Sequence, residues 1–388
     1  MTWSTSQVLS KLPNPVEKLV FDAKGIALNP DAATPAPPVL SLATFSLYST
    51  MNTMLAARLF TPGLRRGAIQ AAAISRPLAS LSAVPRPTTQ VPQEPIPVGR
   101  PDASRSIPHV IRNHQSAPRA EYLLPSDRAE ADRLQLQHDM FKTLYDNKNL
   151  LSKARLTKDS QVLDSGVGSG AWLSAVAKEI PGINIQGIDI EDNLFPRPAP
   201  KNVKLTRMSV LDLPLSWTNR FDLVHQRGFV LGLRREEWPV ALAQLYRVTK
   251  PGGYIQLLDG NLSRARNVGP ANRIQNAMLA ELCRRRGLVL NVTDQLADMV
   301  RAAGFKDIKE DARNIVMSSR NGQLGLDAWT NQYLAFKGLK TPMLKAGGLN
   351  QVQTEGEFDQ MIEDMGREWE EKGGECGYVV VCARKPLN

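Results

Sequence analysis

The sequence predicts an α/β fold in which a mostly parallel sheet has helices on both of its faces. From about residue 120 onward, short apolar runs of strand length alternate with helical stretches, and this alternation is typical of parallel sheets. A glycine-rich turn at residues 166–170 connects the first strand directly to a helix. Seven strands are expected, at residues 161–164, 183–190, 203–209, 221–225, 254–258, 305–316 and 378–383.

Helices are expected before and between these strands. The first follows Tyr122, Leu123 and Leu124, and Ser126 or Asp127 can cap its N-terminus. A long insertion, at about residues 318–374, precedes the last strand. The remaining helices are expected at residues 171–179, 236–248, about 270–286 and 293–303.

Residues 1–118 differ in composition from the rest of the chain. Proline, alanine, serine and threonine dominate them, and no acidic residue occurs between Asp31 and Glu94. Such a composition offers little for a packed core. We therefore expect a low-complexity, disordered tail at residues 1–118, followed by one domain at residues 119–388.

The acid-free part of this tail also allows a second interpretation. Arginines among many small residues are typical of mitochondrial targeting segments. A targeting segment must be N-terminal, so a mitochondrial location requires translation to start at Met51 or Met54. Otherwise a cytoplasmic protein is expected.

The charge and the cysteines limit the classes of partner. The formal net charge is +10, of which residues 1–118 carry +6 and the remaining residues only +4. Because most of the excess lies in the tail, we expect no binding of nucleic acid. The three cysteines (Cys283, Cys376 and Cys382) lack metal-binding spacing, so free thiols and no metal site are expected. The chain has no apolar run of 18 residues, and a membrane span is not expected either.

Residues 161–173 contain the most specific motif of the chain. A short strand ends in Asp164, and Gly166, Gly168 and Gly170 then form a tight turn before a helix. Glycines allow the backbone to turn sharply and a ligand to lie against the main chain. This D-x-G-x-G-x-G pattern resembles the first motif of class I S-adenosylmethionine (SAM) methyltransferases.

A dinucleotide site is the main alternative for this turn. Gly166, Gly168 and Ala171 also satisfy G-x-G-x-x-G/A, and Asp189 lies at roughly the ribose-binding distance of ~20 residues. Asp164 argues against it, because a carboxylate at the strand end would repel a pyrophosphate. SAM has no phosphate and carries an ammonium and a sulfonium, so a carboxylate beside its amino acid portion is attractive. A turn that only packs a helix on a strand is the remaining interpretation.

Two further carboxylates follow strand ends, where open α/β sheets bind ligands. Asp189 ends the second strand, and its oxygens suit a bidentate bond to ribose hydroxyls, although a helix cap is a competing interpretation. Asp212 follows the third strand and can accept from the adenine amino group, unless it is only a turn residue before Pro214.

His225 is the candidate catalytic residue. It lies near the end of the fourth strand, in the run from Phe221 to Arg227, on the expected methyl side of the cofactor. The pKa of histidine suits removal of a proton from a substrate hydroxyl or amine. A packed structural histidine is the competing interpretation, and methyl transfer from a sulfonium depends more on alignment than on a base.

Taken together, the motifs resemble class I methyltransferases in order and spacing over about residues 120–385. They are more closely similar to the fungal secondary-metabolism group, which includes N-methyltransferases of epidithiodiketopiperazine pathways and relatives of a nuclear regulator. The resemblance implies a Rossmann-like seven-stranded sheet whose last strand is antiparallel. The segments that carry it are 164–170, 187–189, 211–214, 221–226 and 250–253 and, for the fungal group, 122–125, 133–138 and 237–239.

The expected function is transfer of a methyl group from SAM to nitrogen or oxygen of a small organic acceptor. Asp164 and the glycine turn would hold the methionine end, Asp189 the ribose and Asp212 the adenine. The N-terminal helix and the insertion would cover the acceptor. A catalytically silent SAM-binding regulator of secondary metabolism and an NAD(P)-dependent oxidoreductase remain alternatives. The sequence does not indicate an oligomeric state.

Overall fold

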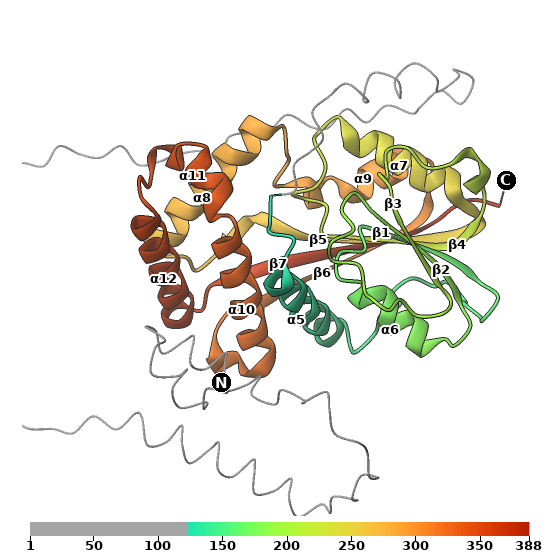
Figure 1. The fold of residues 1–388 in the computed structure, drawn as a ribbon, viewed down its shortest axis with the longest axis horizontal. Coiled ribbons are helices and arrows are strands. Elements are labelled where there is room, and N and C mark those ends of the chain that lie inside the picture. The colour runs from blue at the N-terminus through green and yellow to red at the C-terminus, as the bar shows by residue number, and fades with distance from the viewer. Residues whose placement is uncertain (1–122, 388) are drawn as a thin grey trace, which may run out of the picture. The chain divides into compact units, whose positions relative to one another are not determined.

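The computed structural model describes residues 123–387, except for the side chains of residues 263 and 264. Within this range strands and helices alternate, as expected from the sequence (Figure 1). The tail expected at residues 1–118, with the alternative start sites Met51 and Met54, lies outside the described residues.

The described residues form alternating strands and helices, and the chain ends with a group of helices and one last strand. The strands are β1 (Gln161–Ser165), β2 (Asn184–Asp189), β3 (Val203–Arg207), β4 (Phe221–Arg227), β5 (Thr249–Arg266), β6 (Lys306–Val316) and β7 (Glu375–Arg384). The helices are α5 (Arg128–Leu144), α6 (Ala171–Glu179), α7 (Glu237–Val248), α8 (Pro270–Arg286), α9 (Leu296–Ala302), α10 (Gly322–Gly338), α11 (Lys340–Lys345) and α12 (Glu355–Lys372).

The strands of the described residues form one seven-stranded sheet with the order β3-β2-β1-β4-β5-β7-β6. β1 pairs in parallel with β2 and with β4, and β3 and β5 continue this parallel arrangement outward. β7 is antiparallel to β5 and to β6. The predicted α/β class with a mostly parallel sheet is therefore confirmed, and so is the antiparallel last strand. The strand order reverses between β1 and β4, the point at which open sheets bind ligands.

Helices cover both faces of the sheet. α7 and α9 lie on one face, and α5 and α6 lie on the other (Figure 1). Because successive side chains of a strand point to opposite faces, Leu163 packs with Leu242 of α7, whereas Val162 packs with Leu173 and Val176 of α6. The apolar run of β1 is thus buried on both sides, which fixes the strand at the centre of the sheet.

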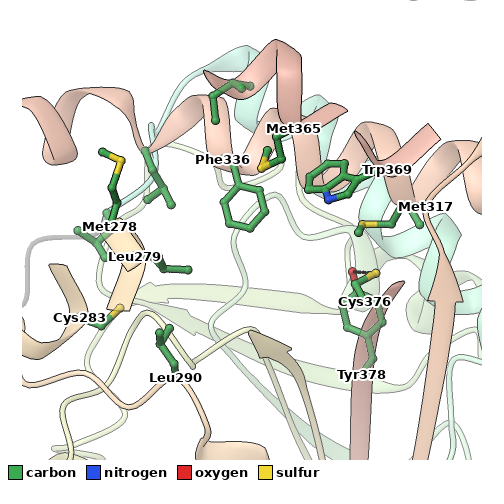
Figure 2. Packing of buried hydrophobic residues seen from close by; sticks show 14 of the residues in the cluster. Met278, Leu279, Cys283, Leu290, Met317, Phe336, Met365, Trp369, Cys376 and Tyr378 are labelled. Carbon is green, nitrogen blue, oxygen red and sulfur yellow. Dashed lines mark hydrogen bonds between the residues drawn. The ribbon is translucent and has the colours of Figure 1, made fainter. Parts of the chain in front are cut away.

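The remaining helices, α8, α10, α11 and α12, form a helical cap at the edge of the sheet where the parallel strands end (Figure 1). Figure 2 shows part of its apolar core, in which Phe336 of α10 lies near Met365 and Trp369 of α12. The indole nitrogen of Trp369 donates a hydrogen bond of 2.9 Å to Asn272 of α8. These contacts hold α10 in place above the strand ends.

Some expected boundaries are wrong. The fifth strand was expected at residues 254–258, but β5 reaches Arg266, because pairing with the antiparallel β7 continues as far as Arg266 and Glu375. The helix expected at residues 293–303 is a 3₁₀ turn, Val292–Asp294, followed by α9. The insertion contains α10, α11 and α12, so most of it is regular structure.

Candidate active site

A cavity of about 830 Å³ lies at the carboxyl ends of the parallel strands, and its volume suits a small-molecule site. One half, which we call the nucleoside half, is lined by residues that follow β1, β2 and β3. The other, which we call the acceptor half, is lined by residues of α5 and α10, of the end of β4, and of β5 and β7. The structure thus brings the N-terminal helix and the insertion together around one cavity.

Gly166 and Gly168 line the cavity, whereas Gly170 begins α6 beneath it. All three have positive φ, at 75°, 51° and 75°, a conformation that other residues adopt only with strain. Gly166 has a second constraint, since a Cβ atom built on it would lie 2.3 Å from the ring of Phe229. The glycine turn therefore has a fixed shape, and its backbone is open to a ligand.

Asp189 lies at the end of β2 and lines the nucleoside half. One of its oxygens accepts the backbone N–H of Gly168 at 2.9 Å, and the other accepts that of Glu191 at 3.2 Å. Burial raises the pKa of this carboxyl, and the backbone hydrogen bonds oppose that shift. Asp189 thus shapes the glycine turn while each of its oxygens keeps a lone pair for a ligand hydroxyl.

Asp212 lies at the rim of the same half, where its side chain is exposed. Glu191 also lines this half, and Arg207 pairs with it at 3.8 Å. With Glu191 paired to Arg207, Asp189 and Asp212 still give the nucleoside half an excess of acidic groups, which disfavours a pyrophosphate. Carboxylates suit the hydroxyl and amino groups of a nucleoside without phosphates, so the residues present fit SAM.

The structure places Asp164 and His225 outside the lining of the cavity. They are register partners on β1 and β4, and His225 Nδ1 lies 2.7 Å from Asp164 Oδ1. The imidazole is stacked on Trp172 of α6, with ring centroids 3.7 Å apart. Burial raises the pKa of Asp164 and lowers that of His225 well beyond their usual values. This geometry therefore gives Asp164 no direct contact with the methionine end. It likewise gives His225 no direct contact with an acceptor.

Asp259, within β5, holds the loop that follows β4. Its two carboxylate oxygens accept the backbone N–H groups of Phe229 at 2.9 Å and Val230 at 3.0 Å. Burial raises the pKa of Asp259 to about 7, although these hydrogen bonds lower it. Since the ring of Phe229 packs against Gly166, this carboxylate positions the wall between the two halves of the cavity.

Arg227, the last residue of β4, lines the acceptor half. Its guanidinium donates to Nδ1 of His138 at 3.3 Å and lies over the ring of Phe141, 5.3 Å from the centroid. Burial lowers the pKa of Arg227 to about 10 and that of His138 to about 4. At neutral pH the arginine is therefore charged and the histidine is neutral.

A second arginine, Arg133 of α5, also lines the acceptor half, but its charge is compensated. It forms two hydrogen bonds with Glu130, at 2.8 Å and 2.6 Å, and one of 2.7 Å with Asn331 of α10. Both Arg133 and Glu130 are buried. This network joins α5 to α10 across the cavity.

Sequence reasoning did not single out Arg133, Phe229 or the second role of Asp189. Arg133 and Asn331 are 198 residues apart, so no local spacing predicts their contact. Phe229 follows a strand, which is a signal for a ligand-facing loop, but its packing on Gly166 depends on tertiary structure. Within residues 123–387, no group of three His, Cys, Asp or Glu side chains is arranged to hold a metal ion.

Comparisons with known proteins show which family the chain resembles. A methyltransferase domain family matches residues 162–253. The chain is 30% identical to N-methyltransferase sirN of Leptosphaeria maculans over 69% of this chain and 96% of that protein. It is 31% identical to N-methyltransferase tcpN of Claviceps purpurea over 66% of this chain and 95% of that protein. A solved phosphoethanolamine N-methyltransferase 2 of Haemonchus contortus is 15% identical, with a TM-score of 0.40, over 65% of this chain and 57% of that chain.

The fold and the site define a class I methyltransferase that uses SAM as its cofactor. Within that class, the chain belongs to the family of fungal secondary-metabolism methyltransferases that includes these N-methyltransferases. No helix among residues 123–387 is long and apolar enough to cross a membrane.

Proposed function

We propose that this protein transfers a methyl group from SAM to a nitrogen or oxygen atom of a small, largely apolar organic acceptor. The observation that carries the proposal is that one cavity contains both an acidic nucleoside half and, beside it at Gly166, a largely apolar acceptor half. Bound SAM supplies an electrophilic methyl group on a sulfonium. The relatives are named N-methyltransferases, which favours nitrogen over oxygen.

In the nucleoside half, Asp189 accepts hydrogen bonds from the ribose hydroxyls and Asp212 accepts from the adenine amino group. The backbone of Gly166 and Gly168 lies against the methionine end. Gly170 acts indirectly, because it allows α6 to begin close below the turn. A Cβ atom built on Gly170 would lie 2.7 Å from the ring of Pro196. These assignments follow the lining of the cavity and the hydrogen bonds that fix the turn.

Asp164 and His225 are assigned as positioning residues. Their buried pair joins the end of β1 to the end of β4, directly beneath the turn and two residues before Arg227. Such a pair fixes the relative position of the two strands, and in group transfer a well-aligned geometry supplies much of the rate. Neither side chain contacts the cavity, so no proton transfer from the acceptor is assigned to them.

The experiment that tests this function is conversion of SAM to S-adenosylhomocysteine (SAH) with small-molecule fractions of the source organism. Full-length protein should release SAH only with fractions that contain the acceptor, and the methylated product should gain 14 Da by mass spectrometry, the expected mass of an added CH₂. Asp189→Ala serves as the control variant. Binding of SAM without product from any fraction would instead support the silent regulator.

The compartment is a separate proposal. We propose a cytoplasmic location for the chain that starts at Met1, and a mitochondrial one for a product that starts at Met51 or Met54. Fluorescent fusions with each start site distinguish the two.

A further inference from the structure

The acceptor half contains one arginine whose charge is not balanced. Within residues 123–387, Arg227 forms no ion pair with a carboxylate, and its polar contact is the neutral His138. Asp164 is the acidic group that acts electrostatically on Arg227, but its carboxyl is hydrogen-bonded to His225 and forms no ion pair with the guanidinium. The charge of Arg133, in contrast, is compensated by Glu130.

The guanidinium of Arg227 is also held in a defined orientation. Its plane lies over Phe141, whose ring in turn packs on Tyr378 of β7 in an edge-on arrangement at 4.8 Å. An arginine fixed by stacking and by a hydrogen bond loses little entropy on binding an oxygen anion. Its side chain is half-buried and lines the cavity, so a ligand can reach its remaining N–H groups.

An unbalanced cation in a half-buried site is costly unless a ligand compensates it. The cofactor carries a sulfonium, which adds a second positive charge to the same cavity. A neutral or cationic acceptor would leave Arg227 without a paired anion, whereas an anionic oxygen is attracted both by Arg227 and by the sulfonium. The surrounding wall is apolar and partly aromatic, with Phe141, Phe336, Leu339 and Tyr378.

From these contacts we propose that Arg227 is a specificity-determining residue that binds an anionic oxygen of the acceptor, such as a carboxylate, enolate or phenolate. This inference rests on the proposed function, and it restricts the acceptor to a ring-bearing or otherwise apolar molecule with one acidic oxygen near the reacting atom. The methionine carboxylate of the cofactor offers the same chemistry, so the test separates the two sources.

The test uses full-length protein saturated with SAH and a matched pair of probes, naphthalene-2-carboxylate and naphthalene-2-carboxamide. Calorimetry at pH 7.5 should show that the wild type prefers the carboxylate. Arg227→Met should lose about 10- to 100-fold of the affinity for the carboxylate, the scale of a charge-assisted hydrogen bond, and keep the affinity for the carboxamide. Arg227→Lys should recover part of the loss. Arg207→Met is the matched control, because Arg207 lines the cavity but already pairs with Glu191.

The cofactor arm compares SAH with 5′-methylthioadenosine, which lacks the amino acid end. SAH affinity should be unchanged in Arg227→Met. A loss of affinity for SAH but not for 5′-methylthioadenosine would assign Arg227 to the methionine carboxylate and overturn the acceptor role. A wild type without preference for the carboxylate probe, or an Arg227→Met variant that keeps the preference, would overturn it as well. These binding measurements need no turnover. A failure of the proposed methyl transfer would therefore appear in the SAH-release assay and not in this test.

Discussion

His225 and Asp164 form a buried pair in which Nδ1 of the imidazole lies 2.7 Å from Oδ1 of the carboxyl. Burial favours the neutral form of both groups, raising the pKa of Asp164 and lowering that of His225. Whichever group holds the proton, the hydrogen bond satisfies both side chains inside the protein. Because the two residues are register partners on β1 and β4, the pair ties together the two strands between which the strand order of the sheet reverses.

Loss of this pair is expected to affect stability more than chemistry. His225→Ala removes a ring stacked on Trp172 and leaves a buried carboxyl without a partner, at a cost of about 2–4 kcal/mol in the free energy of unfolding. Turnover of the folded fraction should fall by much less than the 100-fold or more expected for loss of a general base. Urea unfolding measures the change in the free energy of unfolding, and kcat at low temperature measures the change in turnover. A folded variant that loses its activity and the acid limb of its pH profile would restore the catalytic assignment. Asp164→Asn is the matched variant, since its amide can still form a hydrogen bond with Nδ1 of either tautomer.

Asp189 should dominate the affinity for the cofactor. Asp189→Ala removes a charged acceptor from the nucleoside half and also the acceptor of the Gly168 N–H group. We expect SAH affinity to fall by about 1–3 kcal/mol, the scale of losing a hydrogen bond to a charged group. Isothermal titration measures the loss, and circular dichroism verifies the fold. Unchanged affinity in a folded variant would remove the ribose assignment.

Gly166 should not tolerate even a methyl group. In Gly166→Ala the new Cβ would lie 2.3 Å from the ring of Phe229, at a residue with φ of 75°. The ring must move, and since Asp259 holds its backbone, the wall of the cavity moves with it. We expect weaker SAH binding and a lower melting temperature. Gly356→Ala in α12 is the control, because nothing lies within 4 Å of its Cβ position, and alanine in a helix should stabilise by roughly 0.5–1 kcal/mol.

His138 should make the protein sensitive to acid. Its folded-state pKa is lowered to about 4 by burial, below the value of ~6.5 in unfolded chains. Between these values the unfolded state binds a proton that the folded state does not, so stability is lost as the pH falls from 6.5 towards 4. The loss is at most about 3 kcal/mol. His138→Gln keeps an acceptor for Arg227 and should remove this part of the pH dependence. Equal pH slopes of the unfolding free energy in both proteins would contradict the assignment.

The tail should be dispensable for cofactor binding. A protein comprising residues 119–388 retains every described side chain that lines the cavity, and the tail has a composition unsuited to a packed core. We expect it to bind SAH with the affinity of the full chain in a calorimetric titration. Loss of folding in the shortened protein would show that the tail packs on the domain.

Much of the fold and half of the site follow from the sequence alone, because they depend on local rules. Strands that alternate with helices predict the parallel sheet, and the glycines at 166, 168 and 170 predict the tight turn, in which all three have positive φ. A carboxylate at the end of the second strand predicts Asp189 in the site, since parallel strands end at one edge.

Tertiary structure alone decided which polar side chains line the cavity. Asp164 and His225 lie at the expected edge, but the pleat directs both towards α6, where they satisfy each other. Arg227 keeps its charge unbalanced because α5 offers it His138 and Phe141 rather than a carboxylate. Such pairings join residues far apart in the chain, and which charges are compensated depends on packing that no local spacing encodes.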